Sequence, residues 1–187
     1  MLPLNESVKL FDLLAHGGIF DVQPPTDESI EHINRHFGIS LPESLIEFAK
    51  RSKQFGTWFA SLGEDYNNPF HIIRINRLFK RMRRRSHGDK WRPAKPKAYI
   101  LINHGHDEDC DCLDAANWNK ESGEYQIVYW YPGIKEIEER YKNFSDYIEA
   151  FVLNKIQYHY DNKNSSGQLR RNSREMVKEI DKILSQI

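Results

Sequence analysis

The residue types best suited to chemistry gather in one polar stretch, His104-Gly105-His106-Asp107-Glu108-Asp109-Cys110-Asp111-Cys112-Leu113-Asp114. Imidazoles, carboxylates and thiols can all bind zinc, but zinc sites usually draw on two separated ligand pairs, and no second pair follows. A calcium loop fails as well, because Cys112 stands where glycine is required and Trp118 where the bidentate glutamate should be. We therefore predict no metal site and no cofactor.

Nucleophilic catalysis by the two cysteines is also disfavoured. Cys110 and Cys112 are flanked by aspartates, and neighbouring negative charge raises the pKa of a thiol instead of activating it. The chain has no Gly-x-Ser-x-Gly elbow, no phosphate-binding glycine loop and no His-Glu-x-x-His motif. We predict a protein that is not an enzyme. The polar stretch is then either a turn whose acidic side chains cap the backbone, with both cysteines on one face, or a contact for a partner.

A basic run lies upstream, Lys80-Arg81-Met82-Arg83-Arg84-Arg85, and further basic residues follow it up to Lys97. Such a cluster could bind phosphates or an acidic protein patch, and it could equally be a solvated helix end favoured by the helix dipole. The chain carries 27 basic and 27 acidic residues, so no overall field attracts nucleic acid. Positive charge concentrates near residues 74–97 and negative charge near 107–124, a segregation that suits oriented docking to another protein.

The bulk properties indicate a globular protein. A chain of 187 residues with 39% hydrophobic and 12% aromatic residues can bury a core. Two cysteines so close together cannot cross-link a fold, so a reducing, cytoplasmic setting is expected. No signal peptide and no apolar run long enough to span a membrane is evident.

The elements that must position these residues follow from periodicity and end signals. Helices are predicted over 6–16, over 70–84 after an Asn68 N-cap, over 144–158 and over 171–187. Between the first two of these helices, a helical hairpin is predicted at 26–48. Its first helix ends at Gly38, and its second begins with a Ser40–Glu43 capping box. Strands are predicted over 57–62, 97–103 and 125–131, with a polar, hairpin-like connection over 107–123.

This order favours an α+β fold with an antiparallel or mixed central sheet, helices packed on one side, and further N- and C-terminal helices. One domain is expected over residues 1–160, with a hinge and an amphipathic C-terminal helix over 161–187. That last helix either belongs to the domain or mediates a homodimer. In the strand 125–131, alternation places Tyr125, Ile127 and Tyr129 on one face and Val128 and Trp130 on the other. Both faces are largely apolar, so the strand is either covered on both sides or offers one aromatic face to a partner.

The helical hairpin also carries a resemblance. The spaced isoleucines of its first helix, the glycine, and the run Leu41-Pro42-Glu43-Ser44-Leu45-Ile46-Glu47-Phe48 resemble the opening of the Smi/Knr-type domain of the SUKH superfamily. The likeness continues through Trp58-Phe59, Gly63-Glu64-Asp65, the strand Tyr99–Asn103, the His-Asp-Cys stretch and Phe144–Phe151, and so covers about residues 24–153. Where the family usually places Asn-Gly after the second helix, this chain has Phe55-Gly56.

The resemblance implies an immunity protein that binds and neutralises a cognate bacterial toxin, often a nuclease, without catalysis; some relatives are regulatory scaffold proteins. Its acidic surface would imitate phosphate in the basic groove of a nuclease, and aromatic side chains would anchor the interface. The candidate contact residues are Asp107, Glu108, Asp109, Asp111, Asp114, Trp118, Tyr129 and Trp130. The alternative is a regulatory or nucleic-acid-associated module that uses the basic segment 74–97.

Overall fold

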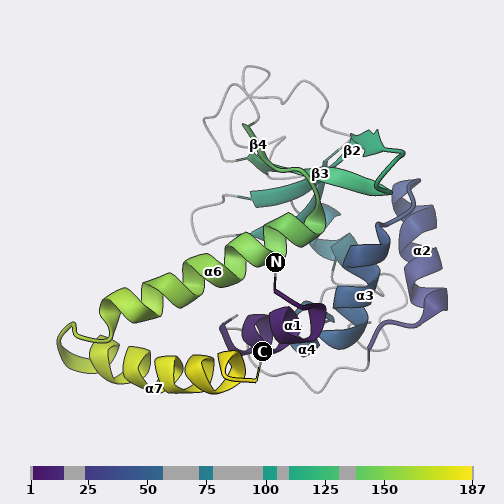
Figure 1. Cartoon of the computed structure of the whole chain (residues 1–187). Coiled ribbons are helices and arrows are strands. Elements are labelled where there is room, and N and C mark those ends of the chain that lie inside the picture. The colour runs from purple at the N-terminus through teal and green to yellow at the C-terminus, as the bar shows by residue number, and fades with distance from the viewer. Residues whose placement is uncertain are drawn as a thin grey trace.

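The computed structural model describes residues 2–14, 24–56, 72–77, 99–104, 110–130 and 138–186. Its labelled helices are α1 (Leu4–Leu14), α2 (Asp27–Phe37), α3 (Glu43–Arg51), α4 (Lys53–Gly56), α6 (Phe144–Asn162) and α7 (Gly167–Leu184), and residues 72–77 are helical as well. The strands are β1 (Tyr99–His104), β2 (Cys110–Asn119), β3 (Glu124–Trp130) and β4 (Glu138–Tyr141). Figure 1 shows the sheet lying on one side of the helices. The predicted α+β class is confirmed.

Within this part of the chain, four strands form an antiparallel sheet in the order β1-β2-β3-β4. The connection predicted over 107–123 is wrong in its central part, since Cys110–Asn119 is a ten-residue strand. Its acidic residues disguise the pattern: Cys110 and Cys112 are buried on one face and Leu113 on the other. β4 was not predicted, because Glu138-Glu139-Arg140-Tyr141 shows no apolar alternation and becomes a strand by pairing with β3.

Both faces of the sheet are covered, as one of the two alternatives for strand 125–131 requires. Tyr125 and Ile127 belong to the main core, which also contains residues of α1, α2, α3 and α6. Val128 and Trp130 face the other side, where they form a smaller cluster with both cysteines and Leu101. The predicted alternation along β3 and the common face of the two cysteines are therefore confirmed.

The helical hairpin at 26–48 is confirmed, with one local error. Thr26 caps α2 by accepting a hydrogen bond from the Ser29 amide (3.2 Å), and Gly38 ends it with φ of 69°. The predicted Ser40–Glu43 capping box is absent: the N-cap of α3 is Pro42, which makes no side-chain capping bond.

The corner between α2 and α3 is held instead from the α2 side. The side-chain oxygen of Asn34 accepts a hydrogen bond from the Leu41 amide (3.0 Å), while its backbone oxygen accepts one from Gly38 (2.8 Å). Asn34 thus fixes the entry into α3, which makes a capping box unnecessary.

The edge of the sheet at β1 is closed by a side chain. The Asn76 amide, 2% exposed, donates to the Leu101 carbonyl (3.1 Å) and accepts from the Leu101 N–H (2.9 Å). The same Nδ2 donates to the Ile72 carbonyl (2.9 Å). Asn76 therefore satisfies the backbone groups of Leu101 as a neighbouring strand would, and covers an edge that could otherwise recruit another chain.

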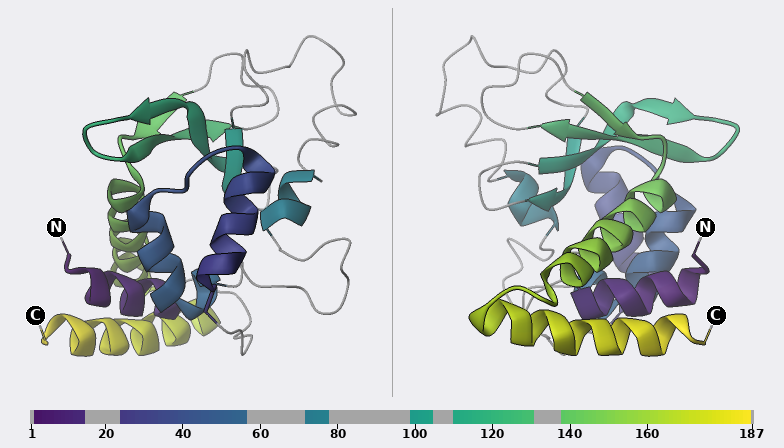
Figure 2. Two further views of the ribbon diagram at one scale, coloured as in Figure 1. Left: turned by 90° about the vertical axis from the view of Figure 1, so that its right-hand side faces the viewer. Right: turned by 60° about the vertical axis from the view of Figure 1, so that its left-hand side comes forward.

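The last two helices form an antiparallel pair that extends from the sheet (Figures 1 and 2). The helix predicted over 144–158 is α6, which continues to Asn162. The helix predicted over 171–187 is α7, which begins earlier, at Gly167, and ends at Leu184. α7 packs on α6 and on α1, and its Ile180 is fully buried in the main core. The apolar face of α7, which could have mediated a homodimer, is thus covered by α1 and α6 of the same chain. The homodimer and the domain boundary near residue 160 both stay predictions.

Several sequence predictions lie outside the described residues. They are the strand over 57–62, the N-cap of the helix predicted over 70–84, and all of that helix except its segment 72–77. The helix predicted over 6–16 is confirmed as α1, which begins two residues earlier. None of the helices described has both the length and the apolar character needed to cross a membrane.

Candidate partner-binding surface

The first candidate residues lie where β2 begins and β3 ends. Asp111 pairs with Tyr129 in the strand register, and Arg140 of β4 bonds the Asp111 carboxylate at 3.0 Å. The Arg140 guanidinium also lies 4.2 Å from the centre of the Tyr129 ring. We call Asp111, Tyr129 and Arg140 the sheet-end cluster. Its aromatic ring and charged pair hold each other in place before any partner arrives.

Arg140 reaches this position because β4 is irregular. The register places Glu139 opposite Val128 and Tyr141 opposite Ile127, so Arg140 is an extra residue between two pairs. Such a bulge redirects a side chain, and here Arg140 turns to the face that carries Asp111. The sequence analysis missed Arg140, because its role depends on a strand that has no sequence signal.

The remaining acidic candidate in β2 has a structural role. Asp114 is 6% exposed and accepts hydrogen bonds from the Ala116 amide (3.0 Å) and the Asn117 side chain (2.6 Å). These bonds stabilise an irregular stretch of β2 between Leu113 and Trp118, where the register with β3 shifts. Asp114 therefore caps the backbone N–H of Ala116, as predicted by the alternative in which acidic side chains of the polar stretch cap the backbone.

Trp118 stands at the tip of the β2–β3 hairpin. It is 39% exposed, and its ring lies 4.5 Å from that of Tyr125, which is buried and hydrogen-bonded to the Ser40 backbone. Gly123, at φ of 67°, closes the hairpin turn beneath the indole, since a Cβ there would lie 4.0 Å from the ring. Trp118 thus presents an aromatic surface on a rigid base.

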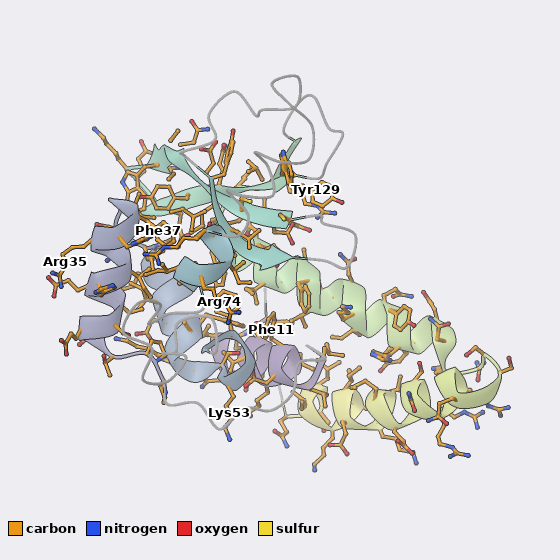
Figure 3. All side chains as sticks on the ribbon, turned by 180° about the vertical axis from the view of Figure 1, so that it is seen from behind. Phe11, Arg35, Phe37, Lys53, Arg74 and Tyr129 are labelled. Carbon is orange, nitrogen blue, oxygen red and sulfur yellow. The ribbon has the colours of Figure 1, made fainter. Side chains whose placement is uncertain are left out.

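The candidate residues do not form one patch. Asp111 pairs with Tyr129 and Trp118 with Tyr125, four positions apart along β3, which separates the two candidates by roughly 13 Å. In Figure 3, Tyr129 is at the end of the sheet away from α2, the helix that carries Arg35 and Phe37. Trp130 is 8% exposed and faces the second core cluster. Asp107, Glu108 and Asp109 lie outside the described residues.

A further acidic group, missed by the sequence analysis, joins three elements. Glu124 opens β3, and its carboxylate accepts hydrogen bonds from the Ser44 hydroxyl of α3 and the Phe144 amide of α6 (3.4 Å). Burial raises the pKa of Glu124, and this effect outweighs the two hydrogen bonds, which lower it. The only signal in the sequence was its place beside the turn glycine.

Glu124 should make stability depend on pH in a defined direction. Because its pKa is raised in the folded protein, the folded state holds this proton more tightly than the unfolded chain. Its stabilising contribution is complete below the ordinary pKa near 4.5 and is lost as pH rises through the folded value. We expect Glu124→Gln to gain stability relative to the unaltered protein as pH rises from 4.5 to 7, measured by urea unfolding.

The matched control is Glu175→Gln, which removes an exposed carboxylate from α7. A stability difference between Glu124→Gln and the unaltered protein that stays constant across this pH range, or changes with the opposite sign, would contradict the assignment.

Among the described residues, no group of three or more histidines, cysteines, aspartates or glutamates is arranged to hold a metal.

Of the three comparisons with known proteins, a search of curated proteins and a search of solved structures find no match. The model of the SMI1 / KNR4 family (SUKH-1) matches residues 24–150, which include α2, α3, the whole sheet and the start of α6. The chain therefore belongs to the SMI1/KNR4 family (SUKH-1).

Proposed function

We propose that this protein is a cytoplasmic immunity protein that binds a cognate bacterial toxin, of the nuclease class, and neutralises it without catalysis. The observation that carries the proposal is membership of the SMI1/KNR4 family over residues 24–150, which is consistent with an immunity-type role. Family membership is a fold-level argument, so the contact surface must be argued from its own chemistry.

The sheet-end cluster supports a role in binding. Tyrosine and arginine dominate the energetics of many interfaces, and a side chain that is already fixed loses little entropy on binding. Tyr129 and Arg140 hold each other through a cation–π contact, and Asp111 fixes the arginine. In this proposal the acidic residues 107–109, which precede β2 in the sequence, add negative charge that attracts a basic toxin groove.

Trp118 is proposed as a second anchor at the other end of the sheet. Its side chain is 39% exposed, and its ring also contacts that of Tyr125, which is buried. The buried candidates, Asp114 and Trp130, would act indirectly by holding the irregular part of β2 and the second core cluster.

The decisive experiment pairs this protein with the candidate toxin domain, which the proposal expects in the neighbouring reading frame. Co-expression should restore growth, and the purified proteins should form a stable complex in which toxin activity falls to zero at stoichiometric addition. Failure to rescue growth together with no complex would overturn the proposal. Filter binding to nucleic acid at increasing salt tests the alternative module at residues 74–97, because phosphate contacts give a steep salt slope.

Charge reversal tests the acidic surface. We expect the triple variant Asp107→Lys, Asp109→Lys and Asp111→Lys to slow association with the toxin by roughly tenfold at low salt and to reduce its salt dependence, since steering acts mainly on the association rate. Stopped-flow kinetics at several salt concentrations would measure both effects.

The control reverses three exposed carboxylates on α2 and α7, Glu28, Glu31 and Glu175, with the same change in net charge. Equal association rates for the two triple variants would remove this acidic surface from the proposal.

A further inference from the structure

A cavity of about 270 Å³ opens between the N-terminal ends of α1, α3 and α6. Phe48, Phe144 and Ile148 form its apolar floor and are each at most 3% exposed. Leu4, which is 39% exposed, lies at its mouth. We call this cavity the three-helix cleft.

The rim of the cleft is acidic. Glu43, Glu47 and Glu149 line it, and none of the described residues that line it is basic. Glu47 is paired with Arg51 outside the cleft (2.9 Å), and one oxygen of Glu149 accepts the Leu2 amide (3.1 Å). The lining residues thus include three carboxylates and no basic side chain.

An anion is a poor occupant even though three helices, α1, α3 and α6, begin here. Helix N-termini attract negative charge through their free amides and their dipoles. In this protein each of these helix ends already carries an acidic side chain, Glu6 in α1, Glu43 in α3 and Asp146 in α6, and Glu124 accepts the Phe144 amide. The charge complementarity of the cleft is for a cation.

The size of the cleft restricts the occupant further. Sites for whole small molecules usually measure roughly 300–1,000 Å³, and about 270 Å³ lies just below that range. Arginine and lysine place an aliphatic stem on apolar surface and keep the charged head at a polar rim. A floor of two phenylalanines and an isoleucine below three carboxylates is arranged in that way.

We propose that the three-helix cleft binds an arginine or lysine side chain carried by an extended segment of a partner protein. The stem would lie on Phe48 and Ile148 and the charged head would reach Glu43 and Glu149. The cleft and Trp118 lie at the same end of the molecule, because Glu124, which bonds two lining residues, pairs across the hairpin with Asn119. One partner could therefore contact both.

The inference rests on the proposed function only in taking the occupant to be a protein, so a peptide probe tests it separately. The probe is acetyl-Leu-Arg-Leu-amide, titrated into the ¹⁵N-labelled full chain. We expect chemical shift changes in the amides of residues 43–48 and 144–149. The same peptide with citrulline in place of arginine keeps the shape without the charge and should bind at least fivefold more weakly.

A double variant tests the rim. Glu43→Gln with Glu149→Gln should weaken binding of the arginine peptide about fivefold, whereas the control Glu28→Gln with Glu175→Gln should leave it unchanged. Equal binding of the arginine and citrulline peptides, or shifts only outside the cleft, would overturn the inference. Shifts in the cleft that appear on raising the protein concentration alone would assign it to a second copy of the chain, and would overturn it equally. A peptide that binds here while the toxin fails to bind would refute only the proposed function.

Discussion

Replacing Phe48 with alanine should lower the free energy of unfolding by about 3–5 kcal/mol, the usual cost of removing a buried phenylalanine ring. Phe48 is 1% exposed and lies where helices meet. Its ring makes edge-on contacts with three other phenylalanine rings. The distances between ring centres are 5.2 Å to Phe11 of α1, 5.5 Å to Phe55 of α4 and 5.7 Å to Phe144 of α6. A cavity here would weaken all these contacts together.

Chemical denaturation monitored by circular dichroism would measure this loss. Leu153→Ala is the matched control, because Leu153 also lies on a helix but is 49% exposed, and its loss should cost less than about 0.5 kcal/mol. If the two variants are destabilised equally, the aromatic junction is not the centre of the core.

Asn76→Leu should produce the second large effect, a destabilisation of about 2–5 kcal/mol. The substitution keeps the branched shape of the side chain, with a larger volume, but leaves the N–H and the carbonyl of Leu101 unpaired, and each buried backbone group without a partner costs about 1–3 kcal/mol. It also uncovers the edge of β1, so the variant should aggregate more readily than its loss of stability alone explains. Denaturation curves and light scattering at matched fractions of unfolded protein would separate the two effects.

The control for this experiment is Asn172→Leu on α7, where an exposed asparagine accepts a hydrogen bond from Gln168 (2.7 Å). We expect only a small change there. A near-neutral Asn76→Leu would mean that water or another group replaces the amide at the sheet edge.

The parts of the fold that sequence predicts well depend on neighbouring residues. α2 has its cap at Thr26 and its stop at Gly38, and both signals act within one turn. β2 was missed because its burial pattern depends on which faces distant segments cover: Cys112 and Leu113 are both buried, on opposite sides. The capping box at Ser40 was wrong for a similar reason, since Asn34, from the preceding helix, already bonds the Leu41 amide.

The candidate surface also depends on contacts between residues that are distant in the sequence. Residue types drew attention to Trp118, which is 39% exposed, and to Asp111, and a binding role for either stays a prediction. Only the register of β3 and β4 brings Arg140 to Asp111, and only the meeting of two helix ends with a strand creates the environment of Glu124. Groups of this kind are assembled by tertiary contacts, and no local pattern encodes them.

The contact between α1 and α7 has a consequence for biosynthesis. Ile180 of α7 is buried in the same cluster as Leu10 and Leu14 of α1, yet about 150 residues of chain separate the two helices. α3, α4 and α6 are made earlier and can cover part of α1. At the usual translation rates of about 5–20 residues per second, the side of α1 that packs on α7 must wait roughly 8–30 s on the ribosome before α7 exists. During that interval this side of α1 is a target for chaperones, and a nascent chain arrested before α7 would be expected to require them.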